Sequence, residues 1–111
     1  MSERVSVEPV AKIRVVHGGH VVAETASGFV IHEQGLPDRY YVPPGDVHAQ
    51  LSPGTGQGTC PWKGEWRHLD VTVEGERIAN GAWTYFDTKR LTRDTQDFVA
   101  FYETKFDIVA A

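Results

Sequence analysis

Residues 68–85 read HLDVTVEGERIANGAWTY, and this stretch decides the fold. Apolar residues at 69, 71 and 73 alternate with polar ones, which is the period expected of a half-buried strand. The Glu74-Gly75 pair supplies a turn, and residues 76–85 return as the partner strand. The Asn80-Gly81 pair inside that partner predicts a β-bulge. The stretch therefore predicts a long β-hairpin.

Shorter strands are predicted on the N-terminal side of this hairpin. Residues 13–16 and 21–23 flank the Gly18-Gly19 pair, which suits a two-residue hairpin turn because glycine accepts positive φ. Residues 29–31 and 39–42 are rich in β-branched and aromatic side chains, and prolines end the second of these runs. Residues 52–58 contain no apolar side chain and predict a mobile surface loop.

The periodicity changes after Phe86. Apolar residues then recur at spacings of three and four, and the pattern is typical of an amphipathic helix. They are Phe98, Phe101, Tyr102, Phe106 and Val109. Asp94 is placed to cap the first turn. The sequence thus predicts a C-terminal helix over residues 94–109.

A chain of 111 residues has room for one hydrophobic core, so residues 1–111 are expected to form a single domain with a flexible N-terminus over residues 1–9. The predicted class is mainly β (α+β), closed by the one helix.

Charge and cysteine content bear on partners and compartment. The formal net charge of -4 disfavours nucleic acid and anionic membranes as partners. No secretory signal and no run of eighteen apolar residues is visible. Cys60 is the single cysteine, which agrees with a reducing compartment, so a cytoplasmic location is expected.

Residues 59–65, TCPWKGE, gather a thiol, an ammonium, a carboxylate and an indole. Lys63 followed by Gly64 suits an anion, because glycine exposes neighbouring backbone amides. The alternative is an ordinary turn with Lys63 in water. Cys60 and Lys63 are the candidate catalytic residues, although an inert, packed thiol is the commoner state of a free cysteine.

Aromatic residues on or beside the predicted strands suggest a ligand cleft with flat apolar walls. The candidate ligand-binding residues are Tyr41, Trp62, Lys63, Gly64, Trp83 and Tyr85. The alternative is that most of these rings fill the core. Trp62 is the exception, because it lies in a polar turn where a ligand-facing role is as natural as packing. Glu33 and Asp46 are further candidate hydrogen-bonding partners of a ligand.

Metal and cofactor sites are not expected. A structural zinc site needs four thiol or imidazole ligands, whereas the chain has one cysteine and five histidines without paired ligand spacing.

The sequence resembles the bacterial family called domain of unknown function 427. The resemblance rests on residues 59–65 together with residues 40–43, 46–47, 83–85 and 101–102, and it spans about residues 13–109. It implies a β-tent, in which two small antiparallel sheets lean together over a cleft, and a nucleotidyltransferase-like label. Gly58-Thr59 stands where Thr-His usually precedes the cysteine, which removes a plausible acid or base beside Cys60.

Three functions follow as expectations. The first is a small-molecule-binding module whose Lys63 contacts an anionic or carbonyl group on a ligand, with nucleotide-like molecules among the candidate ligands. The second is a nucleotidyltransferase-like or phosphoryl-transfer enzyme, with Lys63 as a charge clamp for phosphates. The third is a protein-interaction module or homodimer that uses an exposed strand edge.

Overall fold

The computed structural model describes residues 4–111 and is nearly all β, with 64% of these residues in strands and 8% in helical turns. The strands are β1 (Val5–Val10), β2 (Ile13–His17), β3 (His20–Thr25), β4 (Gly28–Glu33), β5 (Arg39–Tyr41), β6 (Gln50–Cys60), β7 (Gly64–Val73), β8 (Glu76–Thr88), β9 (Val99–Phe101) and β10 (Asp107–Ala110). Two short 3-10 helices, η1 (Pro44–Asp46) and η2 (Arg90–Thr95), complete the described chain. No helix in residues 4–111 has the length and apolar character to cross a membrane.

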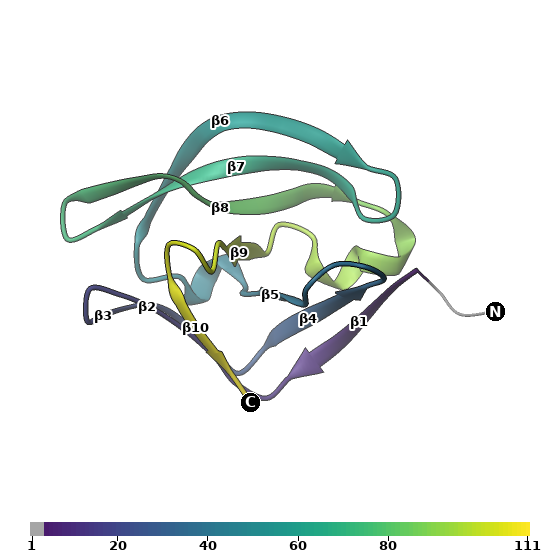
Figure 1. Ribbon diagram of the computed structural model, residues 1–111, viewed down its shortest axis with the longest axis horizontal. Helices are drawn as coiled ribbons and strands as arrows, with labels where there is room; N and C mark the ends of the chain where they lie inside the picture. The colour runs from purple at the N-terminus through teal and green to yellow at the C-terminus, as the bar shows by residue number, and fades with distance from the viewer. Residues whose placement is uncertain (1–3) are drawn as a thin grey trace.

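The strands form three antiparallel sheets, ordered β1-β4-β5, β10-β2-β3 and β6-β7-β8-β9. In Figure 1, β6, β7 and β8 arch over the molecule, and the two three-stranded sheets converge beneath them near the C-terminus. We call β6, β7 and β8 together the arch. Each of the two small sheets packs its own group of buried side chains against the arch. In one cluster, Ile13 and Val15 of β2 are grouped with Val71 of β7, and in the other, Ile31 of β4 and Tyr41 of β5 are grouped with Trp83 of β8.

The long hairpin predicted from residues 68–85 is confirmed as β7 and β8. The pairing changes register between Leu69 and Val71, so the extra residues of β8 form a bulge around Asn80, whose φ is +52°. Asp70 fixes this bulge, because its buried carboxylate accepts hydrogen bonds from the Asn80 backbone N–H (2.9 Å) and from Arg77 Nε (2.8 Å). These two donors hold the pKa of Asp70 below its usual value.

The lowered pKa makes the stability of the hairpin pH-dependent. A carboxylate with a lower pKa in the folded state stabilises the fold above the unfolded pKa of about 4, and this contribution is lost as the pH falls through the folded value. We therefore expect Asp70→Asn to lower the urea midpoint at pH 6, and the gap from wild type to narrow as the pH falls from 5 towards 2. A gap that stays constant over this range would show that Asp70 does not titrate with folding.

The expected pair of sheets closed by a C-terminal amphipathic helix is wrong. There are three sheets, and residues 94–109 form the end of η2, β9, a turn and β10, with no helix of seven residues or more in the described chain. Asp97 has φ of +67°, which interrupts a right-handed helix. Residues 99–101 are buried throughout, and the Phe106 N–H bonds to the Tyr102 carbonyl in a single turn. Because both faces of β9 are buried and a single turn follows, apolar residues recur here at spacings of three and four, as they would in an amphipathic helix.

Two other segments expected to be mobile are strands. Residues 52–58 belong to β6, an edge strand that is paired to β7 and needs no apolar anchor because much of it faces solvent. In the N-terminal stretch expected to be flexible, residues 1–3 lie outside the described residues. Residues 5–9 of that stretch belong to β1, which pairs with β4 and buries Val5 completely.

Candidate functional site

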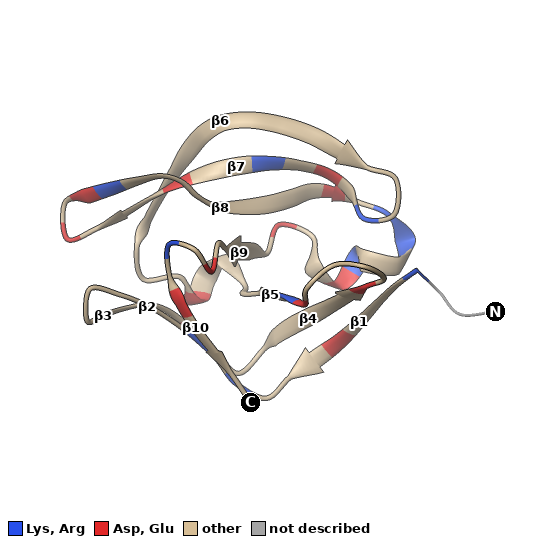
Figure 2. Ribbon diagram, viewed as in Figure 1, with Lys and Arg blue, Asp and Glu red and all other residues tan. Residues whose placement is uncertain are grey.

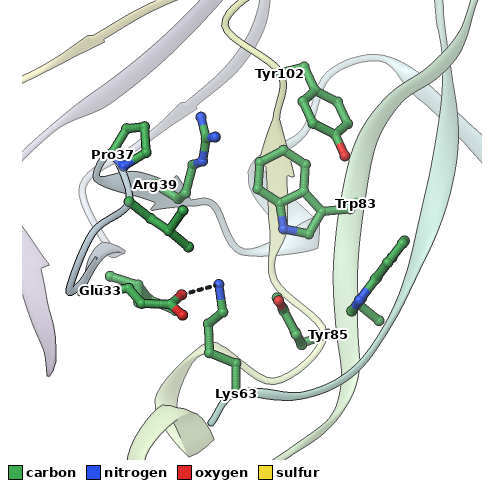
Figure 3. Close-up of a pocket in the computed structure, with 10 residues that line it drawn as sticks. Glu33, Pro37, Arg39, Lys63, Trp83, Tyr85 and Tyr102 are labelled. Carbon is green, nitrogen blue, oxygen red and sulfur yellow. Dashed lines mark ion pairs between the residues drawn. The ribbon is translucent and has the colours of Figure 1, made fainter. Parts of the chain in front are cut away.

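A pocket of about 200 Å³ opens between the β1-β4-β5 sheet and the arch. Its lining comes from β4, the loop before β5, β5 itself, the β6–β7 turn, β7, β8 and the residue after β9. The lining residues are Ile31, Glu33, Leu36, Pro37, Arg39, Lys63, Trp66, Trp83, Tyr85 and Tyr102. Figure 3 shows Pro37 and Arg39 facing Trp83 and Tyr102 across the hollow, with Glu33 and Lys63 side by side at one end.

Lys63 is aimed into this pocket by the turn that precedes β7. Its carbonyl accepts hydrogen bonds from the Lys89 N–H (3.0 Å) and from the buried Thr92 hydroxyl (2.7 Å), which hold the turn against η2. In Figure 2, basic residues gather around this turn and η2. Gly64 follows with φ of +126°, and a side chain there would meet the backbone of Asp87 and Thr88 on β8. The glycine therefore allows the close approach that orients Lys63.

A buried ion pair forms the charged end of the pocket. Lys63 Nζ lies 2.7 Å from Glu33 Oε1, and both side chains are only 10% exposed. Among residues 4–111, Glu33 Oε1 makes no polar contact other than this ion pair. The ammonium also lies 5.4 Å from the centre of the Tyr85 ring, within cation–π range. Glu33 thus neutralises Lys63 at the pocket wall.

The tyrosine hydroxyls of the site are neutral groups. Burial raises the pKa of Tyr85, and the neighbouring Cys60 and Glu33 raise it further. Burial also raises the pKa of Tyr102, against the opposing influence of Arg39. Both phenols therefore keep their proton at neutral pH and offer a ligand hydrogen bonds rather than charge.

His68 orients the Tyr102 hydroxyl. His68 Nδ1 lies 2.9 Å from the Thr55 carbonyl and Nε2 lies 2.9 Å from the Tyr102 hydroxyl. Since a carbonyl only accepts, Nδ1 carries a proton and donates to Thr55, and in the tautomer with its single proton on Nδ1, Nε2 accepts the Tyr102 proton. The Tyr102 oxygen is left as an acceptor at the pocket wall.

The structure separates the sequence-predicted site residues into two groups. Lys63, Trp83 and Tyr85 line the pocket together. Tyr41 lies beneath the pocket, fully buried, where it accepts a hydrogen bond from Trp83 Nε1 (3.2 Å). Burial raises its pKa. Gly64 does not line the pocket and acts through the turn.

Trp62, Cys60 and Asp46 lie elsewhere. Trp62 is 43% exposed and lies outside the pocket, with the Arg4 guanidinium carbon 4.6 Å from the centre of its ring. Cys60 is a free, half-buried thiol packed against the cluster that contains Tyr85. Asp46 accepts a hydrogen bond from the Thr25 hydroxyl (2.6 Å). Within residues 4–111, no three His, Cys, Asp or Glu side chains are grouped as a metal site.

Arg39, Trp66 and Tyr102 line the pocket but are not among the site residues predicted from the sequence. Arg39 follows a turn-rich loop, and Tyr102, although it contributes to the family resemblance, falls in the stretch predicted as a helix, so neither residue was connected with the predicted cleft. Only the pairing of β4 with β5 and of β8 with β9 brings them to one hollow.

The family of the chain follows from comparison with known proteins. A family model described as a domain of unknown function, DUF427, matches residues 6–111. The chain belongs to the DUF427 family. A search of curated proteins gave no match. The sequence-based assignment to this family is confirmed, and the match covers every residue of the pocket.

Proposed function

We propose that this DUF427 domain binds a small molecule that carries a flat ring, in the pocket between the β1-β4-β5 sheet and the arch. The observation that carries the proposal is the convergence of aromatic walls and buried charge on one hollow. Trp83 and Tyr102 lie with ring centres 4.4 Å apart along one wall, and the Lys63–Glu33 pair occupies one end. Ligand pockets combine apolar walls with a few placed polar groups in this way.

The polar groups define what the ring must carry. The Lys63 ammonium has three N–H donors. Its contact with Glu33 uses one of them, so the other two suit a carbonyl or anionic oxygen of the ligand. The Tyr102 oxygen accepts from a ligand N–H or O–H. The proposed ligand is therefore a ring that carries an oxygen acceptor for Lys63, and a donor on that ring would bind the Tyr102 oxygen.

A ligand-observed NMR screen against metabolites and nucleotides tests this proposal. We expect hits to bind Trp66→Ala about 10-fold more weakly than wild type, because Trp66 lines the pocket. Trp62→Ala is the matched control, since this indole lies outside the pocket. Equal weakening in both variants, or in neither, would contradict the proposed site.

Nucleotidyl or phosphoryl transfer and homodimer formation stay predictions from the sequence. No contact within the pocket favours either of them over ligand binding.

A further inference from the structure

We infer that the pocket selects a ligand with a single negative charge, and that Arg39 rather than Lys63 binds that charge. The inference rests on the proposed function, because it names the ligand class of the same pocket. Three charged side chains line the pocket, and they are Glu33, Arg39 and Lys63.

The charge of Lys63 is already compensated. Glu33 Oε1 lies 2.7 Å from its ammonium, and the two side chains share a site that is 10% exposed. An anion brought to Lys63 would also meet the Glu33 carboxylate, and like charges at this distance repel strongly where solvent is largely excluded. Lys63 therefore suits a neutral carbonyl oxygen better than an anion.

Arg39 is the uncompensated cation of the pocket. Within residues 4–111 no carboxylate lies within ion-pair distance of its guanidinium, and its side chain makes no hydrogen bond there. The guanidinium carbon lies 5.8 Å from the centre of the Trp83 ring, and Figure 3 shows the group at the end of the hollow away from Glu33. Its N–H donors match the two oxygens of a carboxylate.

The size and charge of the hollow narrow the ligand class further. One negative charge from Glu33 and two positive charges from Lys63 and Arg39 leave the lining with a net charge of one positive unit. A volume of about 200 Å³ corresponds to roughly six or seven water molecules. A single aromatic ring with one carboxylate fits both quantities, whereas a triphosphate carries far more negative charge than Arg39 can balance. The inferred ligand class is an aromatic monocarboxylate.

The test compares pairs of probes of nearly the same size and shape, in which a charged carboxylate is replaced by a neutral amide. Benzoate with benzamide, and indole-3-carboxylate with indole-3-carboxamide, are titrated by NMR into wild type, Arg39→Gln and Arg4→Gln. Arg4 is the matched control because its guanidinium also lies over an indole, but outside the pocket. We expect wild type and Arg4→Gln to bind each carboxylate about 10-fold or more tightly than its amide, and Arg39→Gln to bind both about equally.

Each outcome separates the inference from the proposed function. Binding of neither carboxylate nor amide to wild type would overturn the proposed function. Binding of both with equal affinity, or a carboxylate preference that survives in a folded Arg39→Gln protein, would overturn only the inference. Phenyl phosphate distinguishes the anion: binding tighter than that of benzoate would overturn the choice of a carboxylate. The double variant Glu33→Leu/Lys63→Met must keep the carboxylate preference, since loss of it would assign the charge to Lys63.

Discussion

Gly64→Ala is expected to destabilise the protein by about 3 kcal/mol or more and to disorder the turn that aims Lys63. The backbone at Gly64 has φ of +126°, which disfavours a side chain. A Cβ atom there would also meet the Asp87 carbonyl oxygen and Thr88 Cα, which are backbone atoms of the paired strand β8 and cannot rotate away. Relief requires that β7 separate from β8 at its first residues.

Two glycine variants separate the steric contact from backbone conformation. Gly45→Ala is expected to change stability by no more than about 0.5 kcal/mol, because Gly45 has no positive φ and open space around it. Gly75→Ala should lose only the stability that a side chain at positive φ costs, because φ is +81° there but nothing lies within 4 Å of the added Cβ. In urea unfolding, Gly64→Ala should be much less stable than either of these variants. Equal stability of Gly64→Ala and Gly75→Ala would contradict the close approach of Gly64 to the backbone of β8.

Breaking the Lys63–Glu33 pair from one side is expected to cost on the order of 3 kcal/mol, because an uncompensated charge is left at a site that is only 10% exposed. Both Lys63→Met and Glu33→Leu should show this loss in urea unfolding. The double variant Glu33→Leu/Lys63→Met should recover most of it, because replacing a buried pair by apolar side chains is often neutral.

The exposed pair Arg14–Glu24 is the matched control for this cycle. Its nitrogen and oxygen lie 2.8 Å apart, compared with 2.7 Å in the buried pair, but its side chains are 46% and 37% exposed. Solvent screening should hold its coupling energy to about 0.5 kcal/mol. If the single losses at Lys63 and Glu33 simply add in the double variant, the pair is not coupled and the charge balance drawn for the pocket is wrong.

The hairpins of this fold were predictable because their signals are local. The Gly18-Gly19 and Glu74-Gly75 turns lie between strands that follow each other in the sequence, and both hairpins are present. The C-terminal segment was not predictable in this way. β9 is buried throughout because its side chains pack into both core clusters: Val99 and Phe101 belong to one, and Ala100 belongs to the other. It therefore lacks the alternation of apolar and polar residues that marks a half-buried strand.

The site was predictable in part for the same reason. Lys63, Trp83 and Tyr85 carry strong chemical or aromatic signals and do line the pocket, whereas Arg39 reaches it only because the β1-β4-β5 sheet faces the arch. The sequence did not indicate that, of the adjacent residues Trp62 and Lys63, only Lys63 would line the pocket. Adjacent side chains in the turn diverge, so with Lys63 directed inward, Trp62 extends outward beneath Arg4.

The indole N–H signals of the three tryptophans, assigned by single Trp→Phe variants, give the most direct measurement of where a ligand binds. Trp66 and Trp83 line the pocket and Trp62 does not. On titration with an aromatic monocarboxylate in two-dimensional 1H–15N NMR, we expect the Trp66 and Trp83 signals to shift in a saturable manner while the Trp62 signal stays in place. A saturable shift of Trp62 with the other two unchanged would contradict the assignment of the ligand site to this pocket.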